Sequence, residues 1–149
     1  MKFSRLVFII LFIFYCAALV CITFIFPARE RKAHTFQYHY IPLESTLAQI
    51  HDPAQYNTPD YWQVFAISLA GNFLLFLPLG FFLRYFFTKM PSSRIFLLAV
   101  FISIAIELLQ LVFHAGVCDI DDVILNGIGA LAGIYLYTSI NKVLRFKFR

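Results

Sequence analysis

Four long apolar stretches constrain this chain more than any other feature of its sequence. They cover residues 6–26, 64–87, 95–113 and 123–140. A helix needs about 20 mostly apolar residues to cross a bilayer. Hydrophobic residues make up 61% of the chain and charged residues only 13%, which is unusual for a soluble domain. We therefore predict an all-α membrane protein, a bundle of four transmembrane helices that forms a single domain over residues 1–149.

The first apolar stretch is preceded by Lys2 and Arg5, as a signal peptide would be. It is longer than the usual hydrophobic region of about 7–15 residues. The residues that follow, Pro27-Ala28-Arg29, are also unlike a small-residue cleavage site. We expect this stretch to remain as a membrane anchor. Because it contains no charged residue, we expect it to pack at the periphery of the bundle.

The basic residues lie mainly on one side of the predicted membrane. With four spans, the two termini and the link between the second and third helices share a side. That side holds nine of the twelve basic residues: Lys2, Arg5, Arg84, Lys89, Arg94, Lys142, Arg145, Lys147 and Arg149. Loops rich in Lys and Arg stay in the cytoplasm, so both termini are expected there. The net charge of +4 reflects this orientation, and we expect no nucleic-acid partner.

The long loop after the first span is predicted to lie on the opposite side. Within it, Leu43, Leu47 and Ile50 recur at the spacing of one helical face. We expect a short interfacial helix there, lying on the membrane surface or over the bundle.

Polar residues inside the apolar stretches indicate a site or a polar seam within the membrane. Glu107 carries a carboxylate that costs roughly 2.5–3.5 kcal/mol at the centre of a spanning helix. Gln110 lies on the same helical face three residues later. Asn72 and Asn126 interrupt two other stretches. Since successive spans alternate in direction, Asn72, Glu107 and Asn126 all fall in the same half of the membrane.

On one face of the fourth stretch, two polar residues are followed by two glycines. Asp122, Asn126, Gly129 and Gly133 follow one another at steps of four, three and four residues. Gly129 and Gly133 form a GxxxG pair, which lets a neighbouring helix approach closely. We predict that the second, third and fourth helices pack around a polar pocket that opens to the outside.

Three motifs resemble those of VanZ-like membrane proteins. Residues 72–80 match the pattern N-x-x-x-F-x-P-x-G, residues 107–110 match E-x-x-Q, and residues 119–126 match D-I-x-D-V-I-x-N. Residues 40–43 resemble the family's outer-loop stretch less completely. Gly116 stands where many members are expected to carry arginine, which removes a possible counter-charge for Asp119 or Asp122.

This resemblance implies a protein of the bacterial plasma membrane. It also implies a contribution to glycopeptide resistance of the teicoplanin type, or to homeostasis of the cell envelope. The expected partner is an amphiphile: a membrane lipid, a lipid-linked envelope precursor or a lipoglycopeptide. The expected ligand-binding residues are Asn72, Glu107, Gln110, Asp119, Asp122 and Asn126.

Two other functions stay open at this point. An intramembrane enzyme acting on a lipid-linked phosphate or sugar would use Glu107 or Asp122 as general base. The sequence contains no evident nucleophile–base pair, so we assign no catalytic residue and favour a protein that is not an enzyme. A small transporter is the third reading, although no polar residue continues the path through the other half of the membrane.

No residue pattern predicts a metal site or a bound cofactor. The carboxylates at 119, 121 and 122 lack the glycine and the terminal glutamate of a calcium loop, although a divalent cation could accompany a phosphate transiently.

Several residues are expected to serve structure alone. We interpret Cys118 as a small apolar filler rather than a nucleophile. For Asp121 or Asp122, the N-cap of the fourth helix and a role in the site stay equally open, because capping needs only one aspartate. Pro78 and Gly80 indicate a kink. The hydroxyls of Ser68 and Ser103 are expected to bond to their own helices.

Overall fold

The structure, a computed structural model, describes residues 2–25, 38–39, 41–43, 47, 59–113 and 118–147. Its elements are, in chain order, α1 (Lys2–Val20), the π-helical turn η1 (Cys21–Ile25), β1 (Tyr38–His39), α4 (Pro59–Phe86), α5 (Ser92–Val112), β2 (Cys118–Asp119) and α6 (Ile120–Lys147).

Within these ranges four helices are long and apolar enough to cross a membrane, which confirms the predicted fold class. The spans are Arg5–Phe24, Leu69–Phe86, Ser92–Val112 and Ile120–Leu144. All four helices begin before the predicted stretches, most clearly α4, which already begins at Pro59, and α6 also continues beyond its stretch to Lys147. Hydropathy marks only the part of a helix that suits lipid, whereas the backbone hydrogen bonds continue beyond it.

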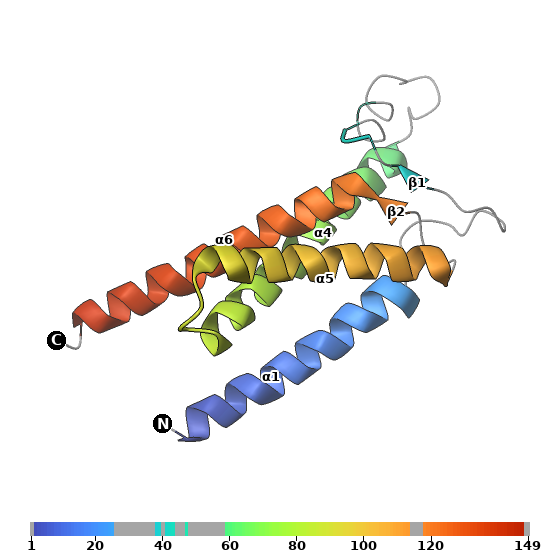
Figure 1. The fold of residues 1–149 in the computed structure, drawn as a ribbon. Helices are drawn as coiled ribbons and strands as arrows, with labels where there is room; N and C mark the ends of the chain where they lie inside the picture. The colour runs from blue at the N-terminus through green and yellow to red at the C-terminus, as the bar shows by residue number, and fades with distance from the viewer. Residues whose placement is uncertain are drawn as a thin grey trace.

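Different segments of the chain form the two ends of the bundle (Figure 1). The beginning of α1, the end of α6 and the α4–α5 link lie at one end, which we call the link end. The strands β1 and β2 and the start of α6 lie at the other, the loop end. Among the basic residues that the structure describes, Arg5, Arg84, Lys89, Arg94 and Lys142 belong to segments at or near the link end, as the alternation of spans predicted.

The closest helix contact is between α4 and α6. A Cβ atom on Gly129 would collide with the backbone carbonyl of Phe73, and one on Gly133 with that of Leu77. A step of four residues along α6, from Gly129 to Gly133, matches a step of four residues along α4, from Phe73 to Leu77. The two helices therefore run parallel. From α4, Gly80 makes the reciprocal contact with the carbonyl of Ala130. The GxxxG prediction is confirmed, and Gly80, which we had associated with a kink, serves this same helix contact.

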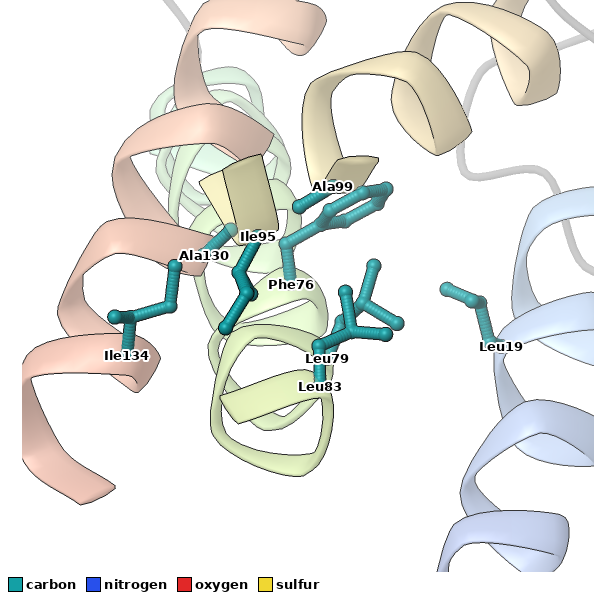
Figure 2. Close-up of a cluster of buried hydrophobic side chains, with 8 residues drawn as sticks. All are labelled: Leu19, Phe76, Leu79, Leu83, Ile95, Ala99, Ala130 and Ile134. Atoms are coloured by element: carbon teal, nitrogen blue, oxygen red, sulfur yellow. The ribbon is translucent and has the colours of Figure 1, made fainter. Parts of the chain in front are cut away.

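A small apolar core fills the space around this contact (Figure 2). Its buried side chains come from all four spanning helices: Leu19, Phe76, Leu79, Leu83, Ile95, Ala99, Ala130 and Ile134. Many other apolar side chains face outward, among them Phe101, which is 69% exposed, and Tyr135, which is 75% exposed. Such exposure suits a surface that contacts lipid rather than water.

As expected, α1 packs at the periphery, with most of its side chains exposed. Phe8 stacks on Tyr85 with ring centroids 4.2 Å apart, and the Tyr15 hydroxyl donates a hydrogen bond of 2.8 Å to the carbonyl of Leu75. Aromatic contacts and this hydrogen bond therefore attach α1 to α4. The predicted interfacial helix falls mostly on residues outside the described ranges, although the backbone N–H of Leu47 does bond to the carbonyl of Leu43 at 2.7 Å.

The glycine contact yields a stability prediction. We expect Gly129→Ala and Gly133→Ala to lower the thermal unfolding midpoint in detergent, because overpacking costs about 1–3 kcal/mol. Gly71→Ala and Gly127→Ala are matched controls. A Cβ on Gly71 meets nothing within 4 Å, and one on Gly127 lies 3.6 Å from the Phe96 ring. The controls should be neutral or stabilising, since alanine favours helix by about 1 kcal/mol over glycine. Equal behaviour of all four variants would contradict the close α4–α6 contact.

Candidate functional site

Buried polar side chains gather where α5, β2 and the start of α6 meet. Ser103 is 0% exposed, Glu107 4%, Asp119 1%, Asp121 5% and Asn126 3%. We call these five residues the polar cluster. None of them faces lipid, so the carboxylate and amide groups of the apolar stretches point into the bundle, as their cost in a bilayer requires.

Glu107 joins α5 to the beginning of α6. Its Oε2 accepts a hydrogen bond of 3.1 Å from the backbone N–H of Asp119. The donor is a main-chain group in β2, a partner that residue spacing along a helix does not indicate. A carboxylate and a backbone N–H form one of the stronger hydrogen bonds in proteins. Glu107 therefore helps to position the segment that enters α6.

Asp119 caps α6. Its Oδ1 accepts a 2.9 Å hydrogen bond from the N–H of Asp121, two residues later, which is the usual contact of an N-cap side chain. We had considered Asp121 or Asp122 as the cap, and that possibility is wrong because α6 already begins at Ile120. Asp121 and Asp122 instead lie in the first turn, where negative charge complements the helix dipole.

Asn126 and Ser103 connect the two helices one turn deeper. The Asn126 Nδ2 donates a 2.9 Å hydrogen bond to the Ser103 Oγ. The expectation that Ser103 needs no role beyond its own helix is therefore wrong. Because α5 and α6 run antiparallel, Ser103 lies one turn from Glu107 and opposite Asn126. The Oδ1 of Asn126 is buried and accepts no hydrogen bond from the residues that the structure describes.

The loop between α1 and α4 is attached to the same region. Tyr38 and His39 pair in parallel with Cys118 and Asp119. The N–H of Leu43 donates a 2.7 Å hydrogen bond to Asp121 Oδ1. Leu43 has φ of 64°, a left-handed conformation that costs a non-glycine residue roughly 1–2 kcal/mol. The contact with Asp121 helps to hold this loop conformation, a role that the sequence did not reveal.

Gln110 lies on the same helix as Glu107 but contacts a different element. Its Nε2 donates a 3.0 Å hydrogen bond to the carbonyl of Thr23 in η1. A backbone carbonyl at membrane depth needs such a donor. The side chain therefore connects α5 to the end of α1, while Glu107 points to β2.

Asn72 and Asp122 are both half-buried. Asn72 precedes Phe73, whose carbonyl contacts Gly129, and Gly129 is less than one helical turn from Asn126. Asp122 follows Asp121 in the first turn of α6. His114 and Gly116 lie outside the described residues. Within the described ranges, no three His, Cys, Asp or Glu side chains are grouped so that they could hold a metal ion.

Cys118 lies in β2, next to the carboxylates of the cluster. Burial raises the pKa of its thiol, and the negative charges of Glu107, Asp119 and Asp122 raise it further. The thiolate is the nucleophilic form of cysteine. A raised pKa therefore leaves less thiolate at neutral pH, which favours our interpretation of Cys118 as a filler.

The raised pKa predicts a shifted reactivity profile. In a Cys16→Ser, Cys21→Ser background, Cys118 is the remaining thiol. We expect it to react with a maleimide more slowly than free cysteine at neutral pH, and its rate to rise only at higher pH. Asp122→Asn should move the profile back toward lower pH, because one of the three negative charges is removed. A profile equal to that of free cysteine would contradict the electrostatic account.

Comparison with known proteins identifies the family. The family model described as VanZ/LLP1 matches residues 12–143. Protein VanZ of Enterococcus faecium is 33% identical over 80 residues, which cover 54% of this chain and 50% of that protein. The aligned part thus spans half the length of this curated relative. No solved structure matches the chain. Since the family model covers most of the chain, including all three motifs and the polar cluster, this membrane protein belongs to the VanZ/LLP1 family.

Proposed function

We propose that the protein binds an amphiphilic ligand at the outer face of the bacterial plasma membrane, and thereby contributes to resistance against glycopeptides of the teicoplanin type. The ligand would be a lipoglycopeptide, a lipid-linked envelope precursor or a membrane lipid. Asn72, Glu107, Asp119, Asp122 and Asn126 would meet its polar head. Gln110 would act more indirectly, since it connects α5 to η1.

The unpartnered Oδ1 of Asn126 carries this proposal. A buried acceptor without a donor costs about 1–3 kcal/mol. Here the acceptor belongs to a residue that is 3% exposed, and the described residues offer it no donor. Apart from Ser103, which accepts from the Nδ2 of Asn126, the other members of the polar cluster are carboxylates. Such surroundings favour a ligand that brings hydrogen-bond donors, such as the hydroxyl, amide and ammonium groups of a sugar or peptide head.

Apolar side chains at the loop end support an amphiphilic ligand. Leu108 is 53% exposed, Val112 64% and Phe113 68%, and all three lie at the end of α5 that carries Glu107. An acyl chain could lie along them while the polar head meets the cluster. The combination of buried polar groups and exposed apolar ones at one membrane depth suits a molecule that itself resides at the membrane surface.

The proposal requires the loop end to face outward. The link end is basic, which supports a cytoplasmic position for both termini. Fusions at the C-terminus test this orientation. We expect a C-terminal green fluorescent protein to fluoresce and a C-terminal alkaline phosphatase to be inactive, because the phosphatase matures only outside the cytoplasm. The reverse pattern would show that the polar cluster faces the cytoplasm, and it would contradict the proposal.

A susceptibility assay tests the function. We expect expression in a teicoplanin-susceptible host to raise the inhibitory concentration of teicoplanin, and Glu107→Gln, Asp122→Asn and Asn126→Ala to abolish the increase. Removing a hydrogen bond to a charged group typically costs about 1.5–3 kcal/mol, or at least tenfold in affinity. The amount of each variant in the membrane is measured by immunoblot.

Thr138→Val is the matched control for these variants. Thr138 is a polar residue of α6 far from the cluster, and its hydroxyl bonds at 2.8 Å to the carbonyl of Ile134 in its own helix. We expect this variant to retain resistance. If Glu107→Gln and Asp122→Asn also retain full resistance, and Asn126→Ala merely lowers the amount of protein, the cluster holds helices together and binds no ligand.

A further inference from the structure

We propose that the link end of the bundle binds the headgroup of an anionic phospholipid. A cavity of about 480 Å³ lies beside the α4–α5 link, at the opposite end of the molecule from the polar cluster. It is lined by Phe86, Phe87, Thr88, Lys89, Met90, Pro91 and Arg94. This site is separate from the proposed function and does not depend on it.

Charge at the link end favours an anion. Lys89 and Arg94 both line the cavity, and both side chains are exposed. None of the eight acidic residues of the chain belongs to the α4–α5 link, to the first 26 residues or to residues 123–149. Of the described residues at this end, Arg5, Arg84, Lys89, Arg94 and Lys142 are basic and none is acidic. A positive field of this kind attracts anionic headgroups at the membrane surface.

Arg84 binds backbone carbonyl groups of the α4–α5 link, which makes the link more favourable for an anion. Its Nη1 donates hydrogen bonds to the carbonyls of Phe87 at 3.2 Å, Thr88 at 3.1 Å and Met90 at 3.4 Å. These bonds hold the backbone that carries Lys89. They also engage three carbonyl oxygens whose negative ends would otherwise repel a phosphate. Arg84 makes these backbone bonds, whereas the two other cations, Lys89 and Arg94, line the cavity.

The position and walls of the cavity point to a lipid rather than to a free ion. The second span ends at Phe86 and the third begins at Ser92, so the link lies at the boundary between hydrocarbon and headgroups. Phe86, Phe87 and Met90 supply apolar walls beside the two cations. A free phosphate gains nothing from such walls. A phospholipid can place its phosphate at the cations and its glycerol and acyl groups against the apolar side chains.

Native mass spectrometry of the purified full chain tests this site. The protein in detergent is titrated with dioctanoyl phosphatidylglycerol, and the apparent dissociation constant of the first bound lipid is measured. We expect Lys89→Gln and Arg94→Gln each to weaken binding about fivefold, as for one basic residue at an anionic surface. Because both side chains are exposed, both variants should keep the wild-type thermal unfolding midpoint.

Three controls separate the possible outcomes. Lys142→Gln removes an exposed charge from α6 toward the same end but outside the cavity, and it should leave binding unchanged. Dioctanoyl phosphatidylcholine should bind more weakly than phosphatidylglycerol. Inorganic phosphate at equal concentration should not displace the lipid.

Three results would contradict the proposal. Equal weakening by Lys142→Gln would indicate general attraction to the surface, and equal binding of phosphatidylcholine would exclude anion recognition. Displacement of the lipid by phosphate would indicate a site for the free ion.

Discussion

The direct backbone contact between α4 and α6 is the constraint on which the rest of the structure depends. In lipid, helices gain little from burying apolar surface, because the lipid chains are as apolar as the side chains. Association therefore relies on close packing, and here glycines on both helices remove the side chains that would keep them apart. Gly129 and Gly133 contact α4, and Gly80 contacts α6. This arrangement sets the position of Asn126, which lies on α6 just above the glycines.

The third spanning helix, α5, is connected to this pair by apolar packing of Ile95 and Ala99 in the core and by polar contacts near the loop end. Glu107 accepts from the backbone of Asp119, and Ser103 accepts from Asn126. The same segment receives β1 and the N–H of Leu43 from the preceding loop. One short stretch, from Cys118 to Asp122, therefore connects α5, α6 and the loop. In this stretch Asp119 caps α6 and Asp121 accepts from the N–H of Leu43. The carboxylates therefore have roles beyond capping, which explains why the stretch contains more than one.

The two ends of the molecule differ in charge and in what they can recognise. The loop end combines buried carboxylates, an amide oxygen without a donor and exposed apolar side chains. It suits a ligand rich in hydrogen-bond donors. The link end combines exposed basic side chains with apolar walls and suits a phosphate ester.

The sequence by itself determined the four helices, the family and the close helix contact at Gly129 and Gly133. Hydropathy and the spacing of small residues are local properties, and each follows from a single segment. It also indicated that Glu107 and Asn126 point inward, because exposure of such groups to lipid is costly. Only the tertiary structure decided their partners. Ser103, Asp121 and Thr23 were missed as partners because their contacts join segments distant along the chain. The expected cap of α6, Asp121 or Asp122, lies two or three residues after the observed one. The helix begins where Glu107 holds the backbone of Asp119, and that bond depends on how α5 lies against α6.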